Sequence, residues 1–544
     1  MKRLLLICVT AFFLLNCKKG NTKVVEALVP PVNPAPTLNA RVSGTNMEAN
    51  VTDRSYNLNI VYFVPKDLDT LSGYQRRLSE LMLYGQNWYK EKMAIYGYDK
   101  TFGMFTDAAK KKVRITTIYG TKNYAQYPSN GGNTVAWEEI NAYFKAHPSE
   151  KTSNHYLLII PRYSFKLNGE PTGPPYYGST FGTERTCFVL DYEEQDLKYM
   201  NDKTDKGKWF RLYYGGILHE LGHALNLPHN RQTESEFADP LKGTGLMYNG
   251  NYSLGVSPTF LTPFDCALLN ENQVMNKNSN TYYGAVNASL TELTANYNPA
   301  KGAIELAGKF NASVPVSNVG ILNDPNVNNE GVGTNKDYNA LSFAVKPNGN
   351  SFSIEMPITE FKYRSNEEYE LKIFLVHTNG TFTVKSYSYK FVNNLPMIDF
   401  SSRAELSKAG WSVKDFSSEE TGAGNRAADV IDGSADTFWH SRWSSNAALY
   451  PHYLTIDLGS SKTVNGGLSL TQRDGASRAI KDFEILVSTD NVNFVSLGTK
   501  VAANGSGTQY FAFDSPKTFR YFKVLAKSSW DGTQNAAIAE LGLY

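Results

Sequence analysis

Three histidines, His219, His223 and His229, constrain the fold of this chain more than any other feature of its sequence. Residues four positions apart on an α-helix differ by about 40° around its axis, so His219 and His223 project from one face. Asn226 and Pro228 then interrupt the helix, because Asn tolerates the left-handed conformation that ends helices and Pro cannot continue one. The sequence therefore predicts a helix that ends soon after His223 and a turn that brings His229 back toward the same point.

The residue types of this segment are those of a zinc site that performs chemistry. Imidazole nitrogens bind Zn²⁺, and three protein ligands leave a coordination position for water or substrate. Glu220 is rotated by about 100° from His219 on the helix, where it can take a proton from water that attacks a peptide carbonyl. Helix-surface histidines are the alternative, but with only 8 His in 544 residues such a match is rare by chance. We predict that the three histidines hold a catalytic Zn²⁺ and that Glu220 is the general base.

The segment resembles the motif of the metzincin clan of zinc peptidases, His-Glu-x-x-His-x-x-Gly-x-x-His followed by a turn that contains Met. Asn226 replaces the Gly of the clan, and Met247 matches the Met of the turn. The resemblance implies an α/β catalytic domain with peptidase activity and an apolar floor made by Met247. In some metzincins a Tyr two places after the Met assists the metal or the oxyanion. Asn249 stands there, so Tyr248 and Tyr252 are the candidates for that role.

The N-terminus predicts export. Two basic residues precede the apolar run 4–15, which is too short to span a bilayer as a helix and is typical of a signal peptide over 1–17. The run ends in Leu-Leu-Asn-Cys17, which resembles the lipobox of bacterial lipoproteins. The resemblance implies that Cys17 is acylated and anchors the protein to the outer membrane, at the cell surface rather than the periplasmic face. Ordinary cleavage, with Cys17 a bystander, is the alternative because Asn16 is unusual there.

A chain of this length is expected to hold several domains. The composition and hydrophobic pattern of the sequence change three times after the signal peptide. Residues 18–55 are polar and contain several prolines, which predicts an extended tether. Residues 56–283 alternate strand-like and helical runs, which predicts the α/β metzincin-like catalytic domain. Residues 284–398 predict an Ig-like β-sandwich that acts as a spacer. Residues 399–544 form a third, β-rich unit.

The hydrophobic patterns predict individual elements within these domains. In the catalytic domain they predict strands over 58–64, 113–119, 156–161 and 178–191, and helices over 71–96, 135–147 and 209–225. In the β-sandwich they predict strands over 303–310, 351–356, 368–376 and 381–391.

The balanced charge of the chain excludes some classes of partner. The chain has 54 Lys and Arg against 52 Asp and Glu, so no global field attracts nucleic acid or an anionic membrane. We expect no nucleic-acid partner, and membrane contact only through the lipid anchor.

With Cys8 removed and Cys17 acylated, Cys187 and Cys266 remain, too few for a disulfide scaffold. The sequence allows either one disulfide bond between Cys187 and Cys266 or two free thiols.

Three stretches of the C-terminal unit, 428–440, 453–459 and 539–541, resemble the discoidin or F5/8 type C domain, a β-jelly-roll family that includes many carbohydrate-binding modules. The resemblance implies a glycan ligand, with His440, Arg473 and Trp530 as candidate contacts, although each could instead be structural. It also implies a structural Ca²⁺; a Ca²⁺-free Asp-Gly turn is the alternative. The implied calcium ligands are the side chains of Asp432, Thr437 and Glu540 and backbone carbonyls near Asp429, Ser434 and Ala539.

These features together predict a lipid-anchored zinc endopeptidase that hydrolyses glycoproteins or cell-surface proteins. A C-terminal glycan-binding module would raise its concentration on such substrates. A carbohydrate-binding surface adhesin with a vestigial peptidase domain is the alternative function. Glu220 argues against it, because a purely structural zinc site has no need of a base beside its ligands. Attachment to a host protein through the discoidin-like domain is a third alternative.

Overall fold

The computed structural model describes residues 41–127, 132–161, 177–179, 185–327, 337–398, 400, 405–505 and 507–544. The predicted signal peptide, Cys17 and most of the predicted tether lie outside these residues. Among the helices of the described residues, none has the length and apolar character needed to cross a bilayer. The chain is multidomain, and three successive domains are described below.

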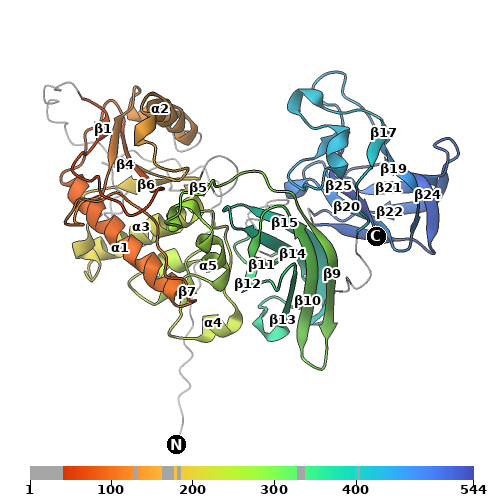
Figure 1. The fold of residues 1–544 in the computed structure, drawn as a ribbon, viewed down its shortest axis with the longest axis horizontal. Coiled ribbons are helices and arrows are strands. Elements are labelled where there is room, and N and C mark those ends of the chain that lie inside the picture. The colour runs from red at the N-terminus through yellow and green to blue at the C-terminus, as the bar shows by residue number, and fades with distance from the viewer. Residues whose placement is uncertain are drawn as a thin grey trace, which may run out of the picture. The chain divides into compact units, whose positions relative to one another are not determined.

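A six-stranded sheet forms the centre of the first domain, in the order β1-β3-β2-β4-β6-β5. Figure 1 labels its strands β1, β4, β5 and β6. The four inner strands are parallel, whereas the two edge strands run antiparallel to their neighbours. Strands β2, β4 and β6 are buried throughout, as expected of parallel strands with both faces covered. The strands are β1 (Gly44–Thr45), β2 (Asn59–Val64), β3 (Thr116–Tyr119), β4 (Tyr156–Pro161), β5 (Tyr177–Ser179) and β6 (Thr186–Asp191).

Helices cover both faces of this sheet. Successive strand residues point to opposite faces, and β2 divides accordingly: Tyr62 packs with helices α1 (Tyr74–Ala94) and α3 (Asp205–Ala224), whereas Phe63 packs with α2 (Gly132–Ala146). The domain is therefore an α/β sandwich, as the alternation of patterns predicts. Shorter elements follow α3, namely α4 (Glu234–Ala238), β7 (Thr244–Gly245), β8 (Thr259–Phe260) and α5 (Pro263–Asn270).

Most predicted elements of this domain are confirmed, with differences at their ends. Helix α3 begins at Asp205 rather than at 209. The prediction began too late because the first turn of the helix is polar and has no apolar periodicity, although Asp205 suits a helix N-terminus. The predicted tether, 18–55, extends too far. Strand β1 pairs with β3, and the Arg54 guanidinium donates to the carbonyls of Thr101 and Val274. Residues 44–55 thus belong to the first domain, through contacts with distant segments that local composition does not reveal.

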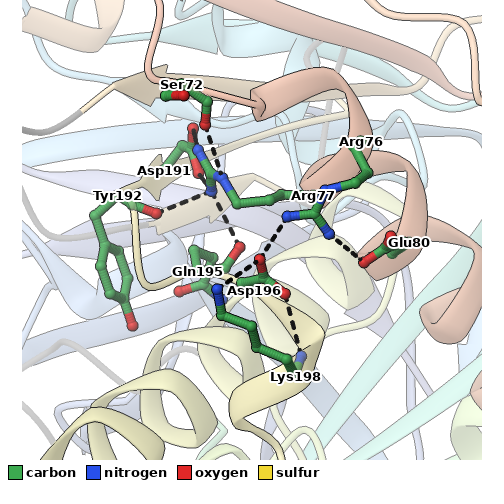
Figure 2. A network of polar contacts seen from close by, with 9 residues as sticks. All are labelled: Ser72, Arg76, Arg77, Glu80, Asp191, Tyr192, Gln195, Asp196 and Lys198. Carbon is green, nitrogen blue, oxygen red and sulfur yellow. Dashed lines mark hydrogen bonds and ion pairs between the residues drawn. The ribbon is translucent and has the colours of Figure 1, made fainter.

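A buried ion pair ties α1 to the end of β6 (Figure 2). Arg77 Nη1 and Nη2 donate to the two carboxylate oxygens of Asp191 over 2.5 and 2.9 Å. Nη1 also donates to the carbonyls of Tyr192 and Gln195, and the Tyr62 hydroxyl donates to Asp191. Burial raises the pKa of Asp191, and the Arg77 guanidinium opposes that shift. Because a buried charge is tolerated only when it is paired, this network fixes α1 against the segment that leads into α3.

Two antiparallel sheets form the second domain, in the orders β13-β10-β9 and β12-β11-β14-β15-β16. Side chains from both sheets, such as Leu306 and Ile321, share one core, so the domain is a β-sandwich. The four strands predicted from the sequence here are confirmed as β10, β13, β14 and β15. The strands are β9 (Ala288–Asn298), β10 (Ala303–Ala312), β11 (Val316–Pro325), β12 (Leu341–Val345), β13 (Ser351–Pro357), β14 (Glu368–His377), β15 (Phe382–Val392) and β16 (Leu395–Met397).

The sandwich also shares a core with the first domain. Leu322, Ala340 and Phe374 belong to the same buried cluster as the side chains of α1 and α3. The ring of Phe374 lies 5.1 Å from that of Phe264 in α5, edge to face. Gly320 allows this approach, because a β-carbon there would lie 2.4 Å from the Phe264 ring. The sandwich therefore packs against the first domain through buried side chains, a contact that the prediction of a spacer did not include.

The third domain is a β-jelly-roll of two sheets, in the orders β17-β19-β24-β21-β22 and β18-β25-β20-β23. Both sheets contribute to one core, in which Trp439 is fully buried. The strands are β17 (Ser412–Phe416), β18 (Trp439–His440), β19 (His452–Val464), β20 (Gly467–Gln472), β21 (Asp482–Ser488), β22 (Val495–Val501), β23 (Gln509–Ala512), β24 (Lys517–Ala526) and β25 (Ala537–Leu543).

Candidate metal centre

The end of helix α3 has the geometry that the sequence predicts for it. The helix ends at Ala224, and Asn226 adopts a left-handed conformation with φ of 72°. The Leu227 amide donates to the Gly222 carbonyl over 3.0 Å, and the Asn226 amide donates to the His223 carbonyl over 2.9 Å. These two bonds form a Schellman motif with Asn in the position that Gly usually takes. The motif reverses the chain and directs it toward His229.

The three histidines converge through their Nε2 atoms. The Nε2 of His229 lies 3.3 Å from that of His219 and 3.0 Å from that of His223. The Nδ1 of His219 lies 2.7 Å from the Leu246 carbonyl, and that of His223 lies 2.8 Å from the Leu227 carbonyl. Because a carbonyl only accepts, both Nδ1 atoms carry the proton, and both Nε2 atoms direct a lone pair inward. The arrangement therefore presents nitrogen acceptors to a common centre.

This geometry fits a zinc ion. Tetrahedral Zn²⁺ with Zn–N bonds of about 2.0–2.1 Å separates its nitrogen ligands by about 3.3 Å, close to the distances above. Burial lowers the pKa of His219 to about 4 and that of His223 to about 3, which keeps both rings neutral, the form that binds metal. Within the described ranges, these histidines form the one group of three His, Cys, Asp or Glu residues with ligand atoms within 4.8 Å of one another.

Glu220 lies between the first two histidines in the sequence and is buried with them. Its Oε2 has no hydrogen-bond partner among the described residues, and burial raises the pKa of this carboxyl to about 8. An unpartnered buried carboxylate destabilises a fold, so such groups are concentrated where chemistry requires them. The position of Glu220 suits the role of a general base that the sequence predicts.

Met247 lies directly against the last turn of α3. The side chain is fully buried, and a β-carbon on Gly222 would lie 2.6 Å from its Sδ. The residue before it, Leu246, supplies the carbonyl that orients His219. The turn that carries Met247 thus supports the three histidines both by packing and by a hydrogen bond.

The two tyrosines proposed from the sequence have different surroundings. The Tyr248 ring lies 5.8 Å from the Arg231 guanidinium, and Tyr252 is 67% exposed. In the described part of the chain, the aromatic side chain stacked on one of the three histidines is Tyr338, whose ring centroid lies 3.6 Å from that of His229 at an interplanar angle of 21°. Tyr338 was not predictable from the sequence, because it belongs to the second domain and no motif marks it.

Four of the predicted calcium-site residues lie together in the third domain. The Thr437 hydroxyl lies 2.7 Å from Asp432 Oδ2 and 3.1 Å from the Ser434 carbonyl. Glu540 Oε1 accepts from the Gly433 amide over 2.6 Å. The pKa of Glu540 is raised to about 7, mainly by burial, while the Lys408 ammonium opposes the shift and a hydrogen bond with Asp432 adds to it. Oxygen ligands of this kind suit Ca²⁺.

The other two predicted calcium-site residues have different surroundings. The Asp429 carboxylate accepts from the Arg426 amide over 2.8 Å, which leaves only its backbone carbonyl for the predicted role. Ala539 is buried within β25. The Lys408 ammonium forms an ion pair with Glu540 Oε2, so a positive charge stands beside this carboxylate.

Each of the three candidate glycan contacts interacts with another residue of the third domain. His440 is buried, with Nδ1 2.6 Å from the Ser441 carbonyl. The Arg473 guanidinium covers the Phe438 ring at 4.3 Å. Trp530 is 41% exposed, and its Nε1 donates to the Ala502 carbonyl. Trp443, which is not among these three candidates, is 51% exposed, and its ring lies 6.4 Å from the His440 ring.

The two cysteines of the first domain are free thiols. Cys187 lies in β6 and Cys266 in α5, and both are buried. Burial raises the pKa of each thiol well above its usual range, which keeps both protonated and unreactive. The disulfide left open by the sequence does not form in this structure.

Comparison with known proteins identifies the C-terminal domain. Residues 413–541 match the model of the F5/8 type C domain. A sialidase from Micromonospora viridifaciens is 33% identical over 138 residues, which cover 25% of this chain and 21% of the sialidase. A galactose oxidase from Gibberella zeae is 31% identical over 145 residues, 26% of this chain and 20% of the oxidase. The chain thus spans about a fifth of the length of these curated relatives.

Solved structures match a larger part of the chain, including the catalytic region. The crystal structure of OgpA from Akkermansia muciniphila is 34% identical, with a TM-score of 0.58, and the match covers 63% of this chain and 96% of that one. A catalytically inactive OgpA in complex with an O-glycopeptide substrate, glycodrosocin, is 33% identical over 64% of this chain and 96% of that chain, with a TM-score of 0.58.

Proposed function

Because this chain belongs to the same family as OgpA, we propose that it is a zinc-dependent endopeptidase that hydrolyses peptide bonds in glycoproteins or cell-surface proteins. The observation that carries the proposal is the convergence of three histidine Nε2 atoms beside the unpartnered carboxylate of Glu220. The substrate class is supported by the OgpA complex with an O-glycopeptide. We assign the catalytic domain to the metzincin type and the second domain to the Ig-like type.

In this proposal His219, His223 and His229 hold the zinc ion, which when bound polarises the scissile carbonyl and makes water a better nucleophile. The Glu220 carboxylate takes the proton that the attacking water loses. It then returns this proton to the amine that leaves, so that no free amide anion forms. The unpartnered Oε2 of Glu220 is available for both transfers. The hydrogen bonds from His219 and His223 to carbonyls keep both rings in the tautomer that binds metal.

The C-terminal F5/8 type C domain would bind a glycan and concentrate the enzyme on glycosylated substrate. We further propose that Asp432, Thr437, Glu540 and nearby backbone carbonyls hold a structural Ca²⁺ there. The alternative of an adhesin with a vestigial peptidase domain is disfavoured by the three histidine nitrogens, which lie within 4.8 Å of one another, and by the buried Glu220 beside them. A domain kept only for its shape would gain nothing from an unpartnered buried carboxylate.

The proposed location is the outer membrane, with the protein facing the cell surface and anchored through an acylated Cys17. The apolar run 4–15 and the lipobox-like residues that end at Cys17 support this location. Cys17→Ser should release the protein from the membrane fraction if Cys17 is the anchor. Membrane retention of that variant would contradict lipidation at this residue.

The test compares the wild type with Glu220→Gln on a panel of glycoproteins and on the same proteins after removal of their glycans. Zinc content is measured in both enzymes. Both should bind about one zinc ion, and the variant should lose cleavage by about 10²-fold or more. Glu91→Gln, an exposed position on α1, is the matched control and should cleave like the wild type. A wild type that holds no zinc, or cleaves no faster than Glu220→Gln, would overturn the proposal.

A further inference from the structure

Tyr338 brings an aromatic ring of the second domain onto the zinc site of the first. Its ring is stacked on His229 at 3.6 Å between centroids and 21° between planes. His229 is the least buried of the three histidines and stands in a loop rather than on the helix. Within the triad it is therefore the histidine whose orientation depends most on contacts made outside α3.

Tyr338 is held in place from its own side by the sandwich. The Lys372 ammonium of β14 pairs with Asp337, the residue before Tyr338, over 2.5 Å. The same ammonium also lies 3.3 Å from Glu370 and 3.8 Å from Asp324. A largely buried ion pair loses little to solvent screening, so it can fix the backbone beside Tyr338.

A backbone link joins the segment after Tyr338 to the segment after His229. The Arg231 amide donates to the Ala340 carbonyl over 2.7 Å, and the Ser342 amide donates to the Arg231 carbonyl over 3.1 Å. The Ser342 hydroxyl donates to the same carbonyl over 3.2 Å. Two residues beyond the stacked rings, the two chain segments are thus paired like neighbouring strands. This link fixes the distance between Tyr338 and His229.

The shared core makes the arrangement rigid over a longer range. Phe374 of β14 packs on Phe264 of α5, and Ala340 is fully buried in the core of the first domain. Lys372, which holds Asp337, lies on the same strand as Phe374. Movement of the sandwich relative to α5 would therefore move Tyr338 away from His229.

From these contacts we infer that Tyr338 is a positioning residue of the zinc site and that the second domain is a part of the peptidase centre. The ring holds the His229 imidazole in the orientation in which its Nε2 meets those of His219 and His223, and it covers that ligand against water. The inference rests on the proposed function, because it concerns the same zinc ion. It requires the aromatic face of Tyr338 and does not require its hydroxyl group.

The test measures how fast zinc leaves the full-length protein when a chelator is added in excess. An aromatic stack contributes enough that Tyr338→Ala should release zinc about 2- to 10-fold faster than the wild type, while Tyr338→Phe should stay within about twofold of it. The cobalt-substituted proteins give a second readout. The visible absorption of Co²⁺ should change in Tyr338→Ala and be restored in Tyr338→Phe, since it reports the orientation of the ligands.

Tyr297→Ala is the matched control, because Tyr297 is a half-buried tyrosine of the same sandwich that packs on its own core. It should lower the melting temperature without changing the rate of zinc release. Equal release rates for Tyr338→Ala and the wild type would overturn the inference, as would an equal acceleration in Tyr297→Ala. If the wild type bound no zinc, the proposed function itself would fail, so the two failures are distinguishable.

Discussion

Gly222 and Met247 are in such close contact that a β-carbon on Gly222 would lie 2.6 Å from the Met247 sulfur. Gly222 lies in the last turn of α3, between Glu220 and His223, so the methionine packs directly beneath the residues of the proposed zinc site. The glycine is needed here for space rather than for an unusual backbone conformation. The packing couples the position of the Met247 turn to that of the metal ligands.

Gly222→Ala should therefore destabilise the protein. Overpacking of a filled core costs about 1–3 kcal/mol, which would appear as a lower midpoint of denaturant unfolding. Zinc content should also fall, because displacement of Met247 moves the Leu246 carbonyl that orients His219. The double variant Gly222→Ala, Met247→Ala should regain part of the lost stability. An unfolding midpoint unchanged in Gly222→Ala would contradict the close packing.

Asn226 should tolerate glycine better than alanine. At φ of 72° a residue with a β-carbon pays about 1–2 kcal/mol, which Asn offsets in part and Gly avoids. We expect Asn226→Ala to lower the unfolding free energy by about that amount and Asn226→Gly to stay near the wild type. Zinc content should follow the same order, since the turn directs His229. Equal losses in both variants would show that the side chain of Asn226, rather than its backbone conformation, matters.

Removal of the Arg77 guanidinium should be among the most damaging changes in the first domain. Arg77→Met leaves the Asp191 carboxylate buried without its partner, a change that typically costs about 3–5 kcal/mol. Arg77→Met with Asp191→Leu should recover much of this loss, because neither charge then remains buried. Denaturant unfolding of the three proteins measures the difference. A double variant no more stable than Arg77→Met would refute the ion-pair explanation (Figure 2).

Glu420 should make the stability of the third domain depend on acidity. Hydrogen bonds from the Trp443 and Ser444 amides, over 2.9 and 2.8 Å, lower the pKa of Glu420 from 4.5 to about 2. A carboxyl group whose pKa is lower in the folded state stabilises the fold above its unfolded pKa. That stabilisation is lost as the pH falls from about 4.5 through about 2.

Glu420→Gln should therefore melt at a lower temperature than the wild type at pH 7, with a difference that shrinks toward pH 2. Thermal melting followed by tryptophan fluorescence measures it, since Trp443 lies beside the carboxylate. Asp514→Asn, an exposed change in the same domain, is the control. A melting difference that does not vary with pH would contradict this role of Glu420.

Calcium should stabilise the third domain if the proposed site binds it. A ligand that binds only the folded state raises its stability in proportion to the logarithm of ligand concentration, so the melting temperature should rise as Ca²⁺ is added and fall with a calcium chelator. Asp432→Asn should remove this response, whereas Asp490→Asn, in another turn of the domain, should keep it. A wild type insensitive to Ca²⁺ would favour the Ca²⁺-free turn, with Lys408 as the cation beside Glu540.

Much of the site was predictable because its information is local. The spacing of His219, Glu220 and His223 on one helix fixes their relative directions without knowledge of the rest of the fold. Asn226 likewise predicts the end of α3, since few residues other than Gly adopt a positive φ at low cost. The alternating patterns of the first domain predicted its strands and helices for the same reason. Their exact ends were less predictable, because polar first turns such as that of α3 carry no pattern.

Other features were not predictable because they depend on contacts between distant segments. The pairing of Gly44–Thr45 with β3 placed residues 44–55 in the first domain instead of a tether. The stack of Tyr338 on His229 and the shared core around Phe374 bring side chains of the sandwich against the first domain and the candidate metal centre. Nothing near Tyr338 in the sequence distinguishes it from the other tyrosines of this chain.

The sequence by itself determined which residues meet at the end of α3, because a helix and the turn that ends it follow from short-range sterics and hydrogen bonding. Only the tertiary structure decided what supports them: Met247 below, the Leu246 carbonyl beside His219, and Tyr338 against His229. These contacts arise when separate segments pack to bury apolar surface, and that packing is a property of the whole fold.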